Sequence, residues 1–482
     1  WNKSTDAETP QNGLTYNIML GTSSGGIQKV SPMANTTTGW RRVVAMGNTN
    51  QNNSWKIKSL PDGDYFWRVQ ALDNNFAGSE WSAEQTFRID ITSPTVPNTT
   101  LTSPNGGEVW KAGTSHDITW NSGDISDALL KNNPISLEYT TDGTNWIGIA
   151  SNEANDGSYT WDPLPNVNSN TVRVRIGVTD STGNAAYDTS NAAFVIDNAP
   201  PTVPNTTLTS PNGGEAWKAG ASYTITWNSG SISDLQLKNN PISLEYTTEG
   251  TNWIGIASGE ANDGLYTWNP VPNVNINTVR VRIIVTDSVG LSSCDTSNED
   301  FIIDNTPPAV SNTTLISPNG GEAWMAGASY NITWNSGSIS DLQLKNNPVS
   351  LEYTTDGMNW IGIASGEAND GAYNWTTPSI NSAAVKVRII VTDSAGNAAY
   401  DTSNATFTID ASAPVIANVT SSTPNGRYKI GDNINVTVNF SENVTLTGGN
   451  LQVVLETGAA DRTVTIPPFG PANSANGEYT VQ

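Results

Sequence analysis

The sequence predicts an all-β protein, built from tandem β-sandwich domains that follow one another in an elongated rod. Three observations favour this fold class: a long internal repeat, alternation of apolar and polar residues along short runs, and frequent turn residues between those runs. Glycine (42 residues) and proline (26 residues) are abundant, and only 14% of the residues are charged. No segment shows the sustained period of an amphipathic helix.

The internal repeat sets the domain organisation. The hexapeptide Ser-Pro-Asn-Gly-Gly-Glu occurs at Ser103–Glu108, Ser210–Glu215 and Ser317–Glu322, so the copies begin 107 residues apart. This period is the size of an independent sandwich domain and too long for a solenoid unit. We therefore expect an N-terminal segment (1–91), repeat 1 (92–198), repeat 2 (199–305), repeat 3 (306–411) and a C-terminal segment (412–482).

Seven strands are expected in each repeat, and repeat 1 illustrates them. The clearest has Val172, Val174, Ile176 and Val178 on one face, with polar residues between them. Period-two patterning over seven strands favours two packed sheets. The expected strands are Leu101–Trp110 with a break at its Pro-Asn-Gly-Gly turn, Asp117–Asn121, Ile135–Thr141, Trp146–Ala150, Ser158–Trp161, Thr171–Asp180 and Ala192–Asp197.

Tryptophan is expected to stabilise the cores, because a single cysteine, Cys294, excludes any disulfide within the chain. Each repeat carries four tryptophans, and large aromatic side chains bury extensive apolar area. The third of each set, Trp146, Trp253 or Trp360, follows a turn and is the best candidate for partial exposure. The alternative role for these three is stacking on sugar rings.

The two flanking segments differ from the repeats. Residues 63–71 contain the pattern Tyr-x-Trp-x-Val-x-Ala, which resembles a late strand of fibronectin type III domains, and Trp1–Lys3 resembles the second strand of that family. Residues 412–482, with alternating apolar positions from Ile434 to Phe440, resemble bacterial Ig-like repeats of surface proteins. Both flanking domains look incomplete, so we interpret the chain as part of a longer precursor. Either truncation or a strand added by a neighbouring chain accounts for the open sheet edges.

The repeats themselves resemble the Ser-Thr-rich β-sandwich modules of fungal cell-wall proteins and of bacterial exported proteins. The motifs that carry the resemblance are Pro104–Trp110, Ile118–Trp120, Asp142–Trp146 and Asp188–Phe194. Together the resemblances imply tandem Ig-like and fibronectin III-like sandwiches in a secreted, cell-surface protein. Modules of this kind serve as spacers, adhesin stalks and appendages of enzymes, so fold alone does not select among these roles.

Composition and motifs argue against several functions. A formal net charge of −23 disfavours binding to nucleic acid or to anionic membranes. No apolar run reaches the length of a membrane span, so no membrane insertion is expected. The only histidine, His116, and Cys294 do not recur in the other repeats, and no nucleophile, zinc or phosphate-loop motif is present. We therefore expect a protein that is not an enzyme.

One acidic pattern recurs at the boundaries between domains. An aspartate ends each preceding domain, a second follows the second strand of the next repeat, and a third ends its sixth strand. Loops after even-numbered strands share one pole of a sandwich, so three carboxylates are expected to converge at each boundary and to bind calcium. The alternative is that each aspartate only caps its own turn. The candidate metal ligands are Asp90, Asp127, Asp180, Asp197, Asp234, Asp287, Asp304, Asp341 and Asp393.

Three functional hypotheses follow. The first is a structural or adhesive surface protein that acts as a rigid stalk or self-associates into a filament or surface layer. The second is a set of ancillary modules of a secreted enzyme, and the third is an array that binds cell-surface glycans. Short proline-rich linkers such as 198–204 act as semi-rigid spacers, so five domains would form a rod of about 200 Å.

Overall fold

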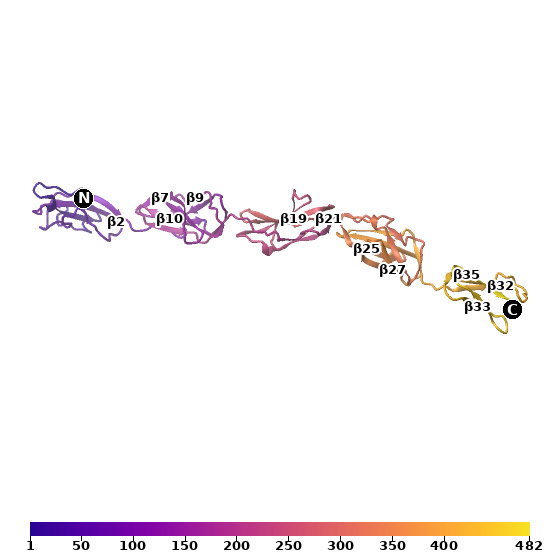
Figure 1. Cartoon of the computed structure of the whole chain (residues 1–482). Coiled ribbons are helices and arrows are strands. Elements are labelled where there is room, and N and C mark those ends of the chain that lie inside the picture. Colours follow the sequence, from indigo (N-terminus) through magenta and orange to yellow (C-terminus); the bar gives the residue numbers. More distant parts are fainter.

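The computed structural model describes residues 1–482, which form five successive groups of β-sheets arranged in a line (Figure 1). The two chain ends lie at opposite ends of this line. Apart from strands, only four single-turn 3-10 helices occur: η1 (Gln11–Gly13), η2 (Ser122–Asp124), η3 (Ser229–Ser231) and η4 (Ser336–Ser338). The chain is therefore all-β, as predicted. No helix is both long and apolar enough to cross a membrane.

Repeat 1 folds into two sheets that contain strands of this repeat only. One sheet has the order β4-β6-β9; the other has the order β5-β12-β10-β7-β8, with β11 also paired to β10. All pairings are antiparallel except β5 with β12, which is parallel. The strands are β4 (Leu101–Ser103), β5 (Val109–Lys111), β6 (His116–Trp120), β7 (Leu130–Thr140), β8 (Ile147–Glu153), β9 (Ser158–Trp161), β10 (Ser169–Asp180), β11 (Ala185–Thr189) and β12 (Phe194–Asp197).

Repeats 2 and 3 have the same topology as repeat 1. The strands of repeat 2 are β13 (Leu208–Ser210), β14 (Ala216–Lys218), β15 (Tyr223–Trp227), β16 (Leu237–Thr247), β17 (Ile254–Glu260), β18 (Leu265–Trp268), β19 (Ile276–Asp287), β20 (Ser292–Thr296) and β21 (Phe301–Asp304). Those of repeat 3 are β22 (Leu315–Ser317), β23 (Ala323–Met325), β24 (Ser329–Trp334), β25 (Leu344–Thr354), β26 (Ile361–Glu367), β27 (Ala372–Thr376), β28 (Ser382–Asp393), β29 (Ala398–Thr402) and β30 (Phe407–Asp410).

The observed strands differ from the expected seven in two ways. The Pro-Asn-Gly-Gly turn separates the first expected strand into β4 and β5, which belong to different sheets. In addition, β11 is a strand that sequence patterning did not reveal, because its residues alternate weakly and one side of it faces solvent. Each repeat therefore has nine short strands.

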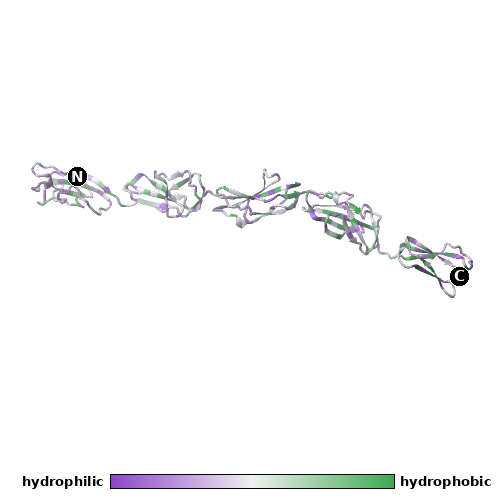
Figure 2. Cartoon of the chain, viewed as in Figure 1, coloured by the Kyte–Doolittle hydropathy of each residue, from purple (hydrophilic) through white to green (hydrophobic).

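The core of each repeat lies between its two sheets. In repeat 1 it contains 15 buried apolar residues, among them Val172, Val174, Ile176 and Val178 of β10, none of which is exposed to solvent. Three of the four tryptophans are buried in every repeat, as predicted: Trp110, Trp120 and Trp161; Trp217, Trp227 and Trp268; Trp324, Trp334 and Trp375. Apolar and polar residues are interleaved along the strands of all five groups (Figure 2).

The N-terminal segment contains one sheet, with the order β1 (Thr15–Gly21), β2 (Gly63–Leu72) and β3 (Gln85–Ile89). The expectation that Trp1–Lys3 forms a strand is wrong, since residues 1–6 have no strand structure. Trp1 instead packs as an aromatic ring against Tyr16 and Trp67, at centroid distances of 6.0 and 6.3 Å.

The C-terminal segment contains a three-stranded and a two-stranded sheet. The first has the order β31 (Ile416–Thr420), β32 (Asn433–Leu446) and β35 (Phe469–Thr480); the second pairs β33 (Leu451–Leu455) with β34 (Arg462–Ile466). Its core is small, with five buried residues, and Val436 and Val438 of β32 belong to it. This is the alternating strand that the sequence predicted.

Candidate metal centres at the repeat junctions

Three clusters of aspartates lie where one unit of the chain meets the next. In each cluster one carboxylate oxygen from every member lies within 4.8 Å of one from both other members. We number the boundaries from the N-terminus, so junction 1 precedes repeat 1 and junction 4 follows repeat 3. The clusters are Asp90, Asp127 and Asp180 at junction 1; Asp197, Asp234 and Asp287 at junction 2; and Asp304, Asp341 and Asp393 at junction 3.

Junction 2 shows which elements position the carboxylates. Asp197 is the last residue of β12 in repeat 1, and Asp287 is the last residue of β19 in repeat 2. Asp234 lies between η3 and β16, directly after Ser233. The backbone N–H of Thr202 in the linker donates to the carbonyl of Ser233 at 2.8 Å, which ties the linker to the loop that carries Asp234. The same backbone bridge occurs at junctions 1 and 3.

One oxygen of each junction aspartate caps a local turn. At junction 2, Oδ1 of Asp197 accepts from the N–H of Ala199 (3.0 Å), and Oδ1 of Asp234 accepts from the N–H of Gln236 (2.7 Å). Oδ1 of Asp287 likewise accepts a backbone N–H, two residues further along, at 2.9 Å. The turn-capping role that aspartate commonly has in loops is therefore present here, but it uses only half of each carboxylate.

The second oxygen is often buried without a partner. Oδ2 has no hydrogen-bond partner in Asp90, Asp197, Asp287 and Asp304. Three of these residues are almost completely excluded from solvent, with exposures of 0% for Asp197, 1% for Asp287 and 0% for Asp304. A buried, unpaired carboxylate oxygen is costly, and a cation bound to it would remove that cost.

The electrostatics of the clusters follow from burial and from like charges. Burial raises the pKa of Asp197 above its usual range, and the carboxylates of Asp234 and Asp287 raise it further, against the lowering effect of the Ala199 N–H. At junction 3, burial and two neighbouring carboxylates raise the pKa of Asp341 in the same way. A bound cation would offset both the cost of burying the carboxylates and the repulsion between them.

Asp180 at junction 1 behaves differently. Burial acts to raise its pKa, but hydrogen bonds from Asn184 and Thr182 outweigh burial and hold the value at about 2. The carboxylate therefore stays ionised at neutral pH. Asn184 donates its side-chain amide to Oδ2 of Asp180 at 2.7 Å, and Asn397 makes the equivalent bond to Asp393 at 2.9 Å.

The donor set of these clusters fits a hard divalent cation. All nine predicted residues are carboxylates placed in three groups, and each group combines one residue from the preceding unit with two from the following repeat. Calcium is bound by six to eight oxygens, with carboxylates, backbone carbonyls and water as the usual ligands. The unpaired Oδ2 atoms supply oxygens that no protein donor already uses.

Junction 4 has no such cluster. Asp410, at the end of β30, is the equivalent of Asp197, and its Oδ1 accepts the N–H of Ser412 at 2.8 Å. Glu442 is the only acidic residue that the C-terminal segment contributes to a cleft of about 680 Å³, which Asp410 also lines. The repeated acidic pattern therefore ends with repeat 3.

Sequence reasoning missed the two asparagines of this site. Asn184 and Asn397 follow the last aspartate of their clusters by four residues, and repeat 2 has Leu291 at the same position. Comparison of the three copies with one another could have revealed this difference. Their ability to reach the preceding unit, described below, was not visible in the sequence.

The half-buried tryptophans do not offer two free faces for sugar stacking. The Arg175 guanidinium lies 4.3 Å from the ring centroid of Trp146, and Arg282 and Arg388 cover Trp253 and Trp360 at 4.3 and 4.2 Å. Each arginine also pairs with a glutamate of the neighbouring strand, for example Arg175 with Glu138 at 2.6 Å. Such cation–π and ionic contacts are typical of structural packing on a sheet face.

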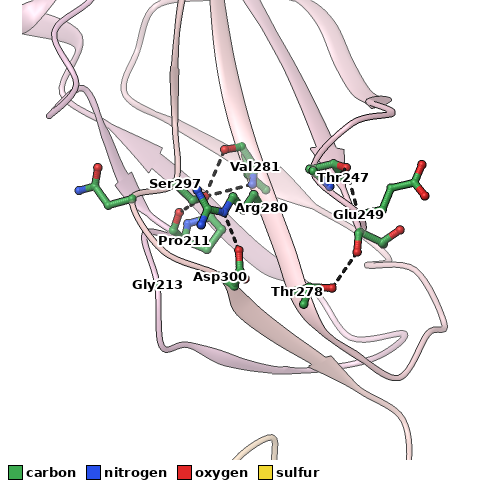
Figure 3. A network of polar contacts seen from close by, with 12 residues as sticks. Pro211, Gly213, Thr247, Glu249, Thr278, Arg280, Val281, Ser297 and Asp300 are labelled. Atoms are coloured by element: carbon green, nitrogen blue, oxygen red, sulfur yellow. Dashed lines mark hydrogen bonds and ion pairs between the residues drawn. The ribbon is translucent and has the colours of Figure 1, made fainter.

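A polar pocket of about 470 Å³ lies beside Trp253 in repeat 2. Figure 3 shows Arg280 directed at Asp300, with an Nε–Oδ1 distance of 2.5 Å, next to the Ser297 hydroxyl that donates to the carbonyl of Pro211. The pocket is lined by Glu249, Gly250, Trp253, Thr278, Arg280, Thr296 and Asp300. Repeat 1 has Ala193 and repeat 3 has Thr406 in place of Asp300, so the ion pair is confined to repeat 2.

His116 and Cys294 have structural surroundings. His116 stacks on Trp110 at 4.5 Å, and Tyr223 and Tyr330 stack in the same way on Trp217 and Trp324. Cys294 lies in β20 as an exposed free thiol, where Tyr187 and Tyr400 stand in the other repeats.

Comparison with known proteins gives no family assignment. No protein-family model matches the chain, and no curated protein matches it. Among solved structures, a Ca²⁺-stabilised adhesin with which an Antarctic bacterium binds ice is 13% identical, with 81% of this chain and 91% of that chain covered and a TM-score of 0.30.

Two further structures are similar at the same level. A tetra-tandem repeat from the extending region of a large adhesion protein is 19% identical, covers 77% of this chain and 90% of that chain, and has a TM-score of 0.25. The FN1–FN3 domains of chicken CNTN1 are 14% identical, with coverages of 60% and 91% and a TM-score of 0.24. At identities and scores this low, the likenesses carry no argument about function.

Proposed function

We propose that the chain is a stalk of a secreted surface protein, with a structural or adhesive role, whose first three junctions bind Ca²⁺. The observation that carries the proposal is the buried, unpartnered Oδ2 of Asp197, Asp287 and Asp304 at boundaries between consecutive units. The five proposed domains are 1–91, 92–198, 199–305, 306–411 and 412–482.

The proposed role of calcium is mechanical. Each cluster takes one carboxylate from the unit before the junction and two from the repeat after it, so an ion bound to all three would hold the two units in one orientation. Removal of the ion leaves three like charges close together in a poorly solvated place, which favours separation of the units. The stalk would therefore be stiff when calcium is bound and more flexible without it.

The first test is calcium binding by the whole chain. Calorimetric titration of the chelator-treated protein with CaCl₂ is expected to show three sites. Ligand that binds only the folded state stabilises by about 2.7 kcal/mol at a hundred times its dissociation constant, so melting temperatures should rise with calcium. No heat of binding, together with an unchanged melting temperature after chelation, would contradict the proposal.

A sharper test is a substitution that should change stability in opposite directions in chelator and in saturating calcium. Asp234→Asn keeps the oxygen that accepts from Gln236 but removes one of the three charges of junction 2. In a chelator the variant should be more stable than the parent, because like-charge repulsion falls; in saturating calcium it should be less stable. Each change is expected to be on the order of 1 kcal/mol, measured by thermal unfolding.

The matched control is Asp263→Asn, which removes the same charge from an exposed turn outside every cluster. It should change stability little, and equally with and without calcium. If Asp234→Asn destabilised the protein equally in both conditions, Asp234 would only support its turn, and the metal site would be disproved at this junction.

The other two hypotheses from the sequence, ancillary modules of an enzyme and a glycan-binding array, stay predictions. The covered tryptophan faces do not favour glycan stacking at Trp146, Trp253 and Trp360. Self-association into a filament or surface layer also stays a prediction, which imaging of the purified chain tests directly.

A further inference from the structure

The three junctions differ at one position of an otherwise repeated loop. The loop that ends the sixth expected strand reads Asp-Ser-Thr-Gly-Asn at 180–184, Asp-Ser-Val-Gly-Leu at 287–291 and Asp-Ser-Ala-Gly-Asn at 393–397. The fifth residue is therefore Asn184 at junction 1, Leu291 at junction 2 and Asn397 at junction 3. The polar amide is missing only at the central junction.

The asparagine amide connects the loop to the preceding unit. At junction 1 the side-chain amide of Asn184 donates to Oδ2 of Asp180 (2.7 Å) and to the backbone carbonyl of Asp90 (3.2 Å). Thr182 adds a second bond from its hydroxyl to the same carbonyl at 3.3 Å. One side chain thus satisfies a junction carboxylate and at the same time holds the end of the unit before it.

Junction 3 has the same arrangement with one bond fewer. The Asn397 amide donates to Oδ2 of Asp393 (2.9 Å) and to the carbonyl of Asp304 (3.4 Å). Ala395 stands where Thr182 stands at junction 1, so no hydroxyl contributes. Asn397 is itself buried, with 5% exposure, so its amide bonds form out of contact with water.

Junction 2 has no such connection. The side chain of Leu291 carries no donor and its backbone N–H goes to Oδ1 of Asp287, so Oδ2 of Asp287 is buried and unpartnered, as is Oδ2 of Asp197. This is the only junction with two orphaned carboxylate oxygens. The backbone bridge between linker and loop is present at all three junctions, so the side-chain amide is what distinguishes them.

We infer that junction 2 is the calcium-dependent joint of the chain, whereas an asparagine side chain latches junctions 1 and 3 even without the ion. The part of this inference that concerns calcium rests on the proposed calcium sites, whereas the part that concerns the asparagine side chains does not. When calcium is bound, all three junctions stay closed. Without calcium, junction 1 is the most stably closed, junction 3 is next and junction 2 is the least stable, in line with the number of side-chain hydrogen bonds to the preceding unit. A fall in calcium would therefore make the stalk flex first at its centre.

Spin labels at equivalent positions of the repeats test this in the whole chain. Ser158, Leu265 and Ala372 are exposed and occupy the same position at the start of β9, β18 and β27. In a Cys294→Ser background, the pair at 158 and 265 reports junction 2, and the pair at 265 and 372 reports junction 3. Distance distributions are measured by pulsed electron spin resonance in chelator and in CaCl₂.

In chelator the 158–265 distribution is expected to be broader than the 265–372 distribution, and in CaCl₂ both should be narrow. Leu291→Asn should narrow the 158–265 distribution in chelator, and Asn397→Leu should broaden the 265–372 distribution in chelator but not in CaCl₂. One hydrogen bond of ordinary strength changes the ratio of closed to open junctions about fivefold. Thermal unfolding of each variant checks that the repeats remain folded.

The outcomes separate the latch from the metal site. Equal widths at the two junctions in chelator, or no effect of either substitution there, would overturn the latch. If the substitutions act in chelator but calcium neither binds nor narrows any distribution, the calcium sites fail and the latch stands. If the two distance distributions have equal widths in chelator and calcium narrows them equally, the calcium sites stand and the latch fails.

Discussion

His116 occupies a position where two different aromatic rings perform one packing role. It stacks on Trp110 with an interplanar angle of 8°, and Tyr223 stacks on Trp217 with an angle of 3°. The tyrosine makes one contact that the histidine does not, since its hydroxyl accepts the backbone N–H of Lys218 at 2.8 Å. The lone histidine thus stands where the other two repeats have a tyrosine that stacks in the same way.

We expect His116→Tyr to stabilise repeat 1 by about 1 kcal/mol, the usual net value of one intramolecular hydrogen bond. Burial lowers the pKa of His116 below its ordinary value of 6.5, against an opposing effect of Asp117. The unfolded chain therefore binds more protons, and the parent protein loses stability as the pH falls below about 6.5. The advantage of the variant should grow in that range, as measured by thermal unfolding between pH 7.5 and 5.

His116→Phe is the control, because it keeps the ring but offers no hydroxyl. It should remove the pH dependence without adding the hydrogen bond. Equal melting temperatures for the two variants at pH 7.5 would show that the hydroxyl contributes nothing at this position.

In the hairpin turn that follows β7, β16 and β25, one residue determines whether a carboxylate caps the backbone N–H groups of the turn. Oδ1 of Asp142 accepts the N–H groups of Thr144 and Asn145, both at 2.8 Å, and Asp356 does the same in repeat 3. Repeat 2 has Glu249 here, and its longer side chain reaches only the side chain of Asn252. The backbone donors of that turn therefore lack the carboxylate cap.

We expect Glu249→Asp to raise the melting temperature of repeat 2 by ~2 °C at neutral pH, because the shorter carboxylate can cap the turn. Hydrogen bonds from Asn145 and Thr144 hold the pKa of Asp142 well below its ordinary value of 3.8. A lowered folded-state pKa means that the stabilisation is present above pH 3.8 and lost as the pH falls through the lowered value. Calorimetry of the whole chain at pH 7 and pH 2.5 measures the rise in melting temperature and its reduction at low pH.

Asp142→Glu in repeat 1 is the reverse substitution and should lower stability under the same conditions. A gain from Glu249→Asp that persisted undiminished at pH 2.5 would contradict the carboxylate-capping explanation.

The molecule as a whole has two kinds of junction. Junctions 1 to 3 combine a backbone bridge with three carboxylates, whereas junction 4 has Asp410 and Glu442 beside an open cleft and no third acidic residue. Under the proposed calcium binding, the ions would join the first four units and would not act on the boundary before the C-terminal segment.

We expect chelation to leave junction 4 unchanged. Spin labels at Ala372 in repeat 3 and Thr463 in β34, both exposed, should give the same distance distribution in CaCl₂ and in chelator. The 158–265 pair, measured in the same conditions, serves as the responsive reference. A junction 4 distribution that narrowed with calcium would require a metal site that uses Asp410 and residues of the C-terminal segment.

Much of the fold followed from local patterning. The run from Val172 to Val178 alternates so regularly that its strand and its buried face were predictable, whereas its place at the centre of a sheet came only from the structure. Strand β11 was not, because its apolar and polar residues alternate only weakly, although it pairs with β10, the strand directly before it in the chain. The strand expected at Trp1–Lys3 does not form, and no neighbouring strand pairs with these residues.

The sequence by itself determined the all-β class, the three copies and the nine aspartates, because repetition at a fixed spacing places equivalent residues at equivalent points of each sandwich. Only the tertiary structure decided how those residues act. Whether Oδ2 of Asp287 is orphaned or Oδ2 of Asp393 is paired depends on one side chain and on a backbone carbonyl of the preceding unit. Contacts across a junction join residues about ninety positions apart in the sequence. Whether such residues meet depends on how whole units pack and not on local sequence.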